Sequence, residues 1–131
     1  MGLFEFFGKK EANNAPDAAN PMPWLSLTRI EQLDALVETS KTIPVVIFKH
    51  STTCGISRMV LRNFEKTYAV PEGSTKLYYL DLLTFRAVSN EVASRFGVWH
   101  QSPQLIIVKN GESVYDASHQ GIDASSIQKF I

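Results

Sequence analysis

The sequence predicts an α/β fold in which a central mixed β-sheet carries helices on both faces. Segments whose apolar residues recur with helical spacing alternate along the chain with short apolar runs typical of strands. Helices that connect successive strands in this way imply that part of the sheet is parallel. Asn110-Gly111 is a strong hairpin signal, so two further strands should form an antiparallel edge. The predicted order is therefore βαβαβαββα.

Residues 1–23 are expected to form an N-terminal extension and linker before a single domain of residues 24–131. The stretch EANNAPDAANPMP has low hydrophobicity and three prolines, which is the composition of a linker. The domain opens with Trp24–Leu27, whose apolar and polar residues alternate as in a short strand. Thr28 has Glu31 three residues later, the spacing of a capping box, so we expect Thr28 to cap the next helix.

The remaining elements follow from the same signals of periodicity, turn residues and caps. Gly97 follows one helix at the position where a left-handed residue is preferred, and Asp123 is placed to cap the last helix. The expected strands are Val45–Phe48, Lys76–Leu83, Leu105–Val108 and Glu112–Asp116, and the expected helices are Ile56–Tyr68, Ala87–Phe96 and Ala124–Ile131.

Composition excludes several classes of protein. Thirteen basic and thirteen acidic residues cancel, so nothing favours a nucleic-acid partner or a membrane surface. A single cysteine cannot form an internal disulfide, and no apolar run is long enough to span a bilayer. The first residues lack the basic start of a signal peptide. We therefore expect a cytoplasmic, monomeric protein.

The only cysteine, Cys54, lies between a predicted strand and a predicted helix. A thiol at the start of a helix faces unpaired backbone N–H groups and the positive end of the helix dipole. Both favour the thiolate, which is the nucleophilic form. The alternative is a small buried hydrophobic residue, but the neighbours Ser51, Thr52, Thr53 and Ser57 are polar and argue against burial.

Residues 24–131 resemble the thioredoxin superfamily. The unit strand–turn–Cys–x–x–Ser–helix lies where thioredoxins have Cys–x–x–Cys, and the segments Phe96-Gly97-Val98 and Leu105 to Glu112 match the thioredoxin tail. The resemblance implies a thioredoxin-like fold, and it implies that Pro103, preceded by Ser102, is the cis-proline that faces the active-site cysteine. Phe48 stands where thioredoxins have a buried aspartate.

Within that superfamily, FKHSTTC-x-IS with the preceding Trp24, Leu25 and Leu27 resembles the monothiol bacilliredoxin-like family. Gly55 stands where members of that family most often have proline. The resemblance implies that Cys54 takes bacillithiol from S-bacillithiolated proteins through a mixed disulfide. It implies thiolated client proteins as partners, bacillithiol or another low-molecular-weight thiol as co-substrate, and neither a metal nor a bound cofactor.

The candidate site contains two groups of residues. Ser57 has no thiol and cannot resolve a mixed disulfide at Cys54, but its hydroxyl could donate a hydrogen bond to the Cys54 thiolate. His50 and Lys49 are nearby cations, and Gly121 and Asp123 fall where related proteins hold a carboxylate, although a left-handed turn and a helix cap are the simpler roles. Cys54, Ser57 and Pro103 are the candidate catalytic residues, and Thr53, Gly55, Ser102, His50 and His100 are the candidates for substrate binding.

Two other functions fit parts of the sequence. Cys54-Gly55-Ile56-Ser57 differs by one residue from the Cys-Gly-Phe-Ser motif of monothiol glutaredoxins, which share an iron–sulfur cluster between two subunits. The shorter segment between Lys49 and Cys54 fits that alternative poorly. The second alternative is a non-catalytic adaptor, because a fold alone does not determine function.

Overall fold

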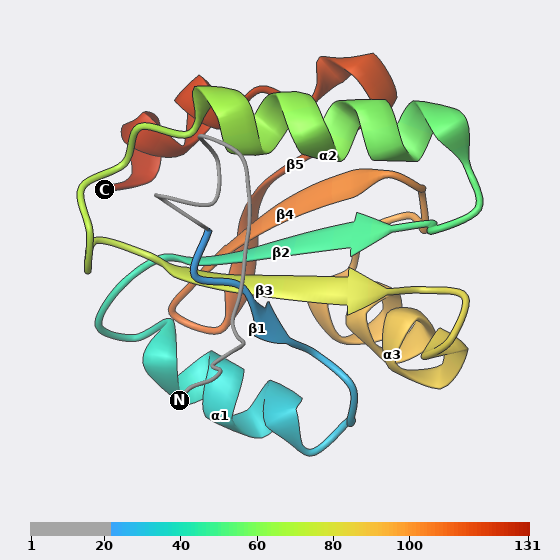
Figure 1. Ribbon diagram of the computed structural model, residues 1–131. Helices are drawn as coiled ribbons and strands as arrows, with labels where there is room; N and C mark the ends of the chain where they lie inside the picture. Colours follow the sequence, from blue (N-terminus) through green and yellow to red (C-terminus); the bar gives the residue numbers. More distant parts are fainter. Residues whose placement is uncertain (1–21) are drawn as a thin grey trace, which may run out of the picture.

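The computed structural model describes residues 22–131, so the predicted extension 1–23 falls almost wholly outside the described residues. Within this range, five strands form one mixed sheet in the order β1-β3-β2-β4-β5 (Figure 1). β1, β3 and β2 are parallel, and β4 and β5 form an antiparallel hairpin at one edge, as predicted. The elements are β1 (Leu25–Ser26), α1 (Gln32–Thr39), β2 (Val45–His50), α2 (Gly55–Thr67), β3 (Lys76–Asp81), α3 (Arg86–Phe96), β4 (Gln104–Lys109), β5 (Glu112–Ser118) and the 3-10 helices η3 (His119–Gly121) and η4 (Ala124–Phe130).

Helices cover both faces of the sheet, which confirms the predicted α/β architecture. In Figure 1, α2 and η4 lie on one face, and α1 and α3 lie on the other. Each face has its own core, because alternate residues of a strand point to opposite faces. Val46 and Phe48 of β2 pack with α2 and η4, whereas Val45 and Ile47 pack with α1 and α3. No helix within residues 22–131 is long and apolar enough to cross a membrane.

The central strand β2 is longer than the sequence predicted. It continues past Phe48 through Lys49 and His50, and every residue of the strand is buried. Hydrophobicity could not reveal this extension, since lysine and histidine read as the start of a polar turn. Both side chains find hydrogen-bond partners in the interior, which is the condition for burying polar groups.

The predicted capping box at Thr28 is wrong. Helix α1 begins at Gln32, and the Gln32 side-chain oxygen accepts the backbone N–H groups of Thr28 at 2.7 Å and Arg29 at 2.9 Å. The side-chain amide of Gln32 therefore forms the hydrogen bonds that hold the start of this segment, in place of the predicted bonds between Thr28 and Glu31. A glutamine oxygen reaches back across one turn as easily as a threonine hydroxyl reaches forward.

Turn predictions were confirmed where a positive φ was required and wrong at Gly121. Gly97 ends α3 in the left-handed region with φ 64°, and Asn110 and Gly111 both have positive φ in the hairpin. Near the C-terminus the left-handed residue is His119, with φ 56°, and Gly121 has no positive φ. Asp123 caps the last element as predicted, but that element is a 3-10 helix.

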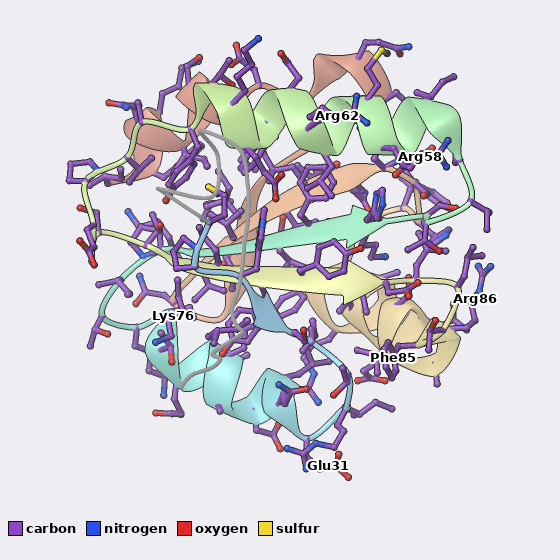
Figure 2. All side chains as sticks on the ribbon, viewed as in Figure 1. Glu31, Arg58, Arg62, Lys76, Phe85 and Arg86 are labelled. Atoms are coloured by element: carbon purple, nitrogen blue, oxygen red, sulfur yellow. The ribbon has the colours of Figure 1, made fainter. Side chains whose placement is uncertain are left out.

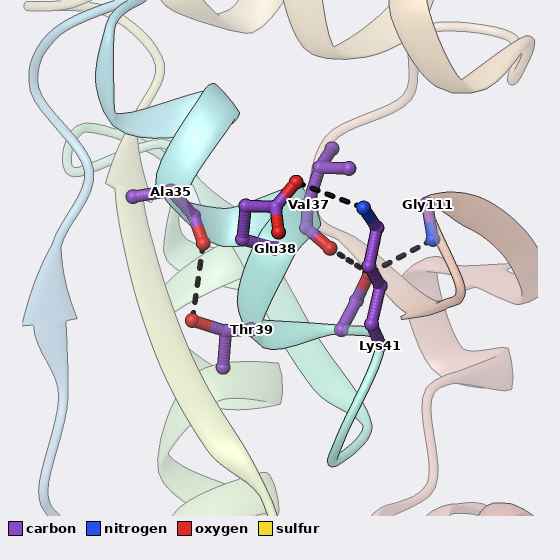
Figure 3. Close-up of polar contacts among 7 residues, drawn as sticks. Ala35, Val37, Glu38, Thr39, Lys41 and Gly111 are labelled. Atoms are coloured by element: carbon purple, nitrogen blue, oxygen red, sulfur yellow. Dashed lines mark hydrogen bonds and ion pairs between the residues drawn. The ribbon is translucent and has the colours of Figure 1, made fainter.

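Ser40 joins the end of α1 to the β4–β5 hairpin. Its hydroxyl donates to the Val37 carbonyl at 2.6 Å and accepts the Gly111 N–H at 2.8 Å (Figure 3). Its carbonyl accepts the Asn110 N–H at 2.8 Å. The side chain of Ser40 is almost fully buried, so these contacts fix the hairpin against the helix.

We predict that Ser40→Ala lowers the free energy of unfolding by about 1–3 kcal/mol, because the Gly111 N–H loses its acceptor in a partly buried position. Thr39→Ala is the matched control. The Thr39 hydroxyl bonds only to the Ala35 carbonyl on the same exposed helix face, so its loss should stay within about 0.5 kcal/mol. Urea unfolding of both variants measures the difference, and equal losses would contradict the proposed link.

Candidate functional site

Cys54 lies at the N-cap of α2, immediately after the turn that follows β2. Its backbone is extended, with φ −102° and ψ 122°, and its carbonyl accepts the Arg58 N–H at 3.0 Å as the first bond of the helix. The thiol therefore occupies the position where a capping side chain accepts first-turn N–H groups. Cys54 is half-exposed, so the sulfur combines access to solvent with the positive end of the helix dipole.

Ser57, at the position of a second cysteine, is fully buried and bonded away from Cys54. Its hydroxyl accepts the Ser51 N–H at 3.1 Å and lies 2.8 Å from His50 Nδ1. In this buried position the hydroxyl proton needs an acceptor, and Nδ1 provides one when His50 carries its proton on Nε2. No hydrogen bond from Ser57 to Cys54 exists among the described residues, so the predicted donation to the thiolate stays a prediction.

His50 lies in the interior at the end of β2. It is only 4% exposed, and burial lowers its pKa, with Asp81 raising it less and Arg58 lowering it further. Burial therefore disfavours the cationic form of His50 that the sequence analysis considered. Its ring instead packs beside Tyr79, with ring centroids 5.6 Å apart, and holds the Ser57 hydroxyl.

Pro103 lies near the C-terminal end of β2, as Cys54 does. The peptide bond between Ser102 and Pro103 is cis, as the resemblance implied. β4 begins with the next residue, Gln104, which pairs with Lys49 near the end of β2. Pro103 is therefore level with the end of β2, on the α2 face, while Ser102 is half-buried beside it.

On the α3 face of the sheet, the same end of β2 contains a buried polar cluster. Lys49 is fully buried, and its Nζ donates to the Ser89 carbonyl at 3.2 Å and lies 3.3 Å from His100 Nδ1. Burial, and to a smaller extent Arg86, lowers the pKa of Lys49 to about 8. His100 is thus held against α3, on the face opposite Ser57. Since its Nδ1 contacts Lys49, only its Nε2 is available for the predicted role in binding substrate.

Gln104 fixes the loop that precedes Pro103. Its Nε2 donates to the Trp99 carbonyl at 2.8 Å, while its Oε1 has no partner among the described residues although the side chain is fully buried. The Trp99 ring is 86% exposed. The loop before Pro103 is thus held by Gln104 and exposes the large apolar side chain of Trp99 near the candidate site.

The other predicted binding residues lie around the Cys54 turn. Thr53 and Gly55 are exposed, and a Cβ built on Gly55 would lie 3.8 Å from the Arg58 guanidinium. Arg58 Nη1 donates to the Thr52 carbonyl at 3.2 Å. Asp123, by contrast, accepts the Ser125 N–H as a helix cap, which is the simpler of its two predicted roles.

Sequence reasoning missed the polar residues on the α3 face of the sheet. Ser89 and Gln104 carry no motif, and their importance comes from contact with Lys49 and with the Trp99 loop. The only available signal was a lysine directly after an apolar strand, which is more often exposed. Within residues 22–131, no three His, Cys, Asp or Glu side chains are grouped so as to hold a metal ion.

Comparison with known proteins identifies relatives of this arrangement. Residues 25–127 match the family described as Monothiol bacilliredoxin BrxC. A solved thioredoxin-fold protein of suggested oxidoreductase activity is 33% identical, with 81% of this chain and 91% of that chain covered and a TM-score of 0.69.

Two thioredoxins share the fold at lower identity. Malassezia sympodialis thioredoxin is 24% identical, with 79% of this chain and 84% of that chain covered and a TM-score of 0.61. Reduced Schistosoma mansoni thioredoxin pre-protein is 23% identical, with 84% and 100% covered and a TM-score of 0.60. These two similarities establish the thioredoxin fold.

We predict that Lys49→Met raises the free energy of unfolding at pH 7 by about 1–3 kcal/mol, since an apolar side chain of similar length avoids burying an ammonium group. The folded-state pKa of Lys49, about 8, lies below the unfolded value of 10.5. Its cost is therefore constant below pH 8 and fades as the pH rises to 10.5.

Urea unfolding at pH 7 and pH 10 measures this dependence, with exposed Lys76→Met as the matched control. The advantage of Lys49→Met over wild type should shrink between the two pH values, and that of Lys76→Met should stay near zero at both. An advantage of Lys49→Met that does not change with pH would contradict a buried, titrating Lys49.

Proposed function

Because the chain belongs to the monothiol bacilliredoxin family, we propose that it removes bacillithiol from S-bacillithiolated proteins through Cys54. The observation that supports this most directly is the half-exposed thiol at the N-cap of α2, with buried Ser57 in place of a second cysteine. A single accessible thiol can accept a group from a mixed disulfide but cannot release it with a partner of its own.

The proposed exchange needs only thiols and disulfides. The Cys54 thiolate attacks the bacillithiol sulfur of the client disulfide, a new S–S bond forms, and the old S–S bond breaks. The client leaves as a thiolate and takes a proton from solvent. A second small thiol, as its thiolate, then attacks the small-thiol sulfur of the Cys54 adduct and returns the Cys54 thiolate. One free small thiol is thus oxidised for each client thiol released, and it leaves in a disulfide with the small thiol taken from the client.

The buried partners of Ser57 support a one-thiol cycle. His50 and Ser51 engage the Ser57 hydroxyl, so the first turn of α2 is held against the end of β2 while Cys54 reacts. Phe48, where thioredoxins have a buried aspartate, packs between Trp24 and Phe64 and offers no base. The proposed cycle has no resolving step within the protein, so it does not require such a base.

We predict that a peptide carrying bacillithiol in a mixed disulfide loses it when incubated with the reduced protein. Intact mass should show one bacillithiol added to wild-type protein and none added to Cys54→Ser, whose hydroxyl does not exchange with disulfides. The same measurement with a glutathionylated peptide tests the choice of small thiol. A peptide that stays modified would refute the proposal and leave the adaptor alternative.

We predict that Ser57→Cys shortens the life of the Cys54 adduct at least about tenfold, because a thiol one helical turn away has a very high effective concentration. Ser89→Cys is the matched control: Ser89 is equally buried but lies against Lys49, on the other face of the sheet. Adduct decay followed by mass distinguishes the two variants. Equal decay rates would mean that the Ser57 position is out of reach of Cys54.

The iron–sulfur alternative makes a separate prediction. Reconstitution with iron and sulfide under anaerobic conditions, with a small thiol present, would give a brown dimeric protein. We expect a colourless protein, because the short segment between Lys49 and Cys54 fits the glutaredoxin alternative poorly and the helix-capping position of Cys54 suits exchange. A brown product that loses its colour in Cys54→Ser would favour cluster transport.

A further inference from the structure

Helix α2 carries two arginines in line with Cys54. Arg58 and Arg62 follow the N-cap at positions i+4 and i+8, and residues with that spacing lie on one face of a helix. At 1.5 Å per residue, their Cα atoms are displaced by about 6 Å and 12 Å along the helix axis. Figure 2 shows both on α2, with Arg58 nearer the turn that contains Cys54.

A hollow of about 240 Å³ lies beside these arginines. Its lining residues are His50, Arg58, Leu61, Arg62 and Glu65. The volume is that of about eight water molecules at ~30 Å³ each, so it accommodates the tail of a small molecule and not a folded segment of protein. Leu61 provides an apolar wall, and the guanidinium groups provide hydrogen-bond donors.

The guanidinium groups retain donors for a ligand. Within residues 22–131 neither Arg58 nor Arg62 forms an ion pair, and Arg58 spends one N–H on the Thr52 carbonyl. The Glu65 carboxylate in the hollow accepts the Trp24 indole N–H at 2.7 Å. Asp81, the acid beside His50, accepts the Thr84 hydroxyl at 2.8 Å. A neutral donor does not cancel the charge of a carboxylate, so the lining of the hollow combines the two guanidinium groups with one carboxylate, that of Glu65.

We propose that Arg58 and Arg62 bind the anionic tail of the small thiol that Cys54 accepts, with this tail lying in the hollow. This inference rests on the proposed role of Cys54 as acceptor of a small thiol. Guanidinium groups hold carboxylates in a two-pronged geometry, and a disulfide at Cys54 would start at one end of the arginine row.

The same contacts determine which sulfur is attacked. In a mixed disulfide, the Cys54 thiolate can attack either the small-thiol sulfur or the client sulfur, and only the first attack frees the client. A tail bound along α2 holds the small-thiol sulfur next to Cys54 and leaves the client sulfur as the leaving group. The arginines therefore act as specificity residues in the exchange.

Three symmetrical disulfides of different charge test the proposal: dithiodiglycolate, which is anionic, bis(2-hydroxyethyl) disulfide, which is neutral, and cystamine, which is cationic. Rates of adduct formation on Cys54, measured by intact mass, should fall in that order. The double variant Arg58→Gln, Arg62→Gln should slow the anionic reagent by roughly three- to tenfold and leave the neutral one within about twofold. Both substitutions keep good helix formers on an exposed face.

Lys76→Gln is the charge control, because Lys76 lies at the opposite end of the sheet from Arg58 (Figure 2). It should leave all three rates unchanged. An arginine double variant that retains the anionic preference, or that slows all three reagents equally, would overturn the inference. Failure of wild-type Cys54 to react even with the neutral disulfide would instead refute the proposed function.

A second measurement reads the direction of attack. A peptide joined to mercaptosuccinate by a disulfide should leave mercaptosuccinate on Cys54 of the wild-type protein. In the double variant, a larger share of Cys54 should carry the peptide. The same division of adducts in both proteins would show that the arginines do not orient the disulfide.

Discussion

The end of β2 buries two polar side chains on opposite faces of the sheet, and the arrangement of the site depends on how each is satisfied. Lys49 points to the α3 face and bonds to the Ser89 carbonyl, while His50 points to the α2 face and bonds to Ser57. A buried polar group without a partner costs more than an ordinary hydrogen bond contributes. These two bonds therefore fix α3 and the first turn of α2 relative to the central strand.

The His50 contact also shapes the chemistry. Since His50 and Ser51 engage the Ser57 hydroxyl, Cys54 stands at the N-cap of α2 without a side-chain partner among the described residues. Its reactivity then depends on the helix dipole, the free first-turn N–H groups and solvent access. A thiol in that setting suits exchange with an external disulfide, which is the chemistry proposed here.

The surface around Cys54 has two different sides. Along α2 lie the charged side chains Arg58 and Arg62 with the hollow between helix and sheet. The loop before Pro103 presents the Trp99 ring, held in place by Gln104. A mixed disulfide also has two unlike halves, a small polar thiol and a protein. An asymmetric surface can accordingly bind the two halves in one orientation and direct the attack to one sulfur.

The sequence by itself determined the element order, the mixed sheet, the Asn110-Gly111 hairpin and the position of Cys54 at the start of a helix. Each of these depends on local chemistry: periodicity, turn preference and a cysteine between a strand and a helix. The sequence also carried the family resemblance, which located the cis bond at Pro103. The errors at Thr28 and Gly121 were likewise local, since several nearby polar groups could serve the same cap or turn.

Only the tertiary structure decided how Lys49, His50 and Ser57 are used. Whether a lysine after an apolar strand is exposed or buried depends on which helix covers it. Ser89, whose carbonyl accepts the hydrogen bond of Lys49, lies forty residues away in the chain. The lowered pKa of His50 likewise follows from its burial beneath α2. Burial and long-range hydrogen bonds are properties of packed elements, so no local pattern of residues could reveal them.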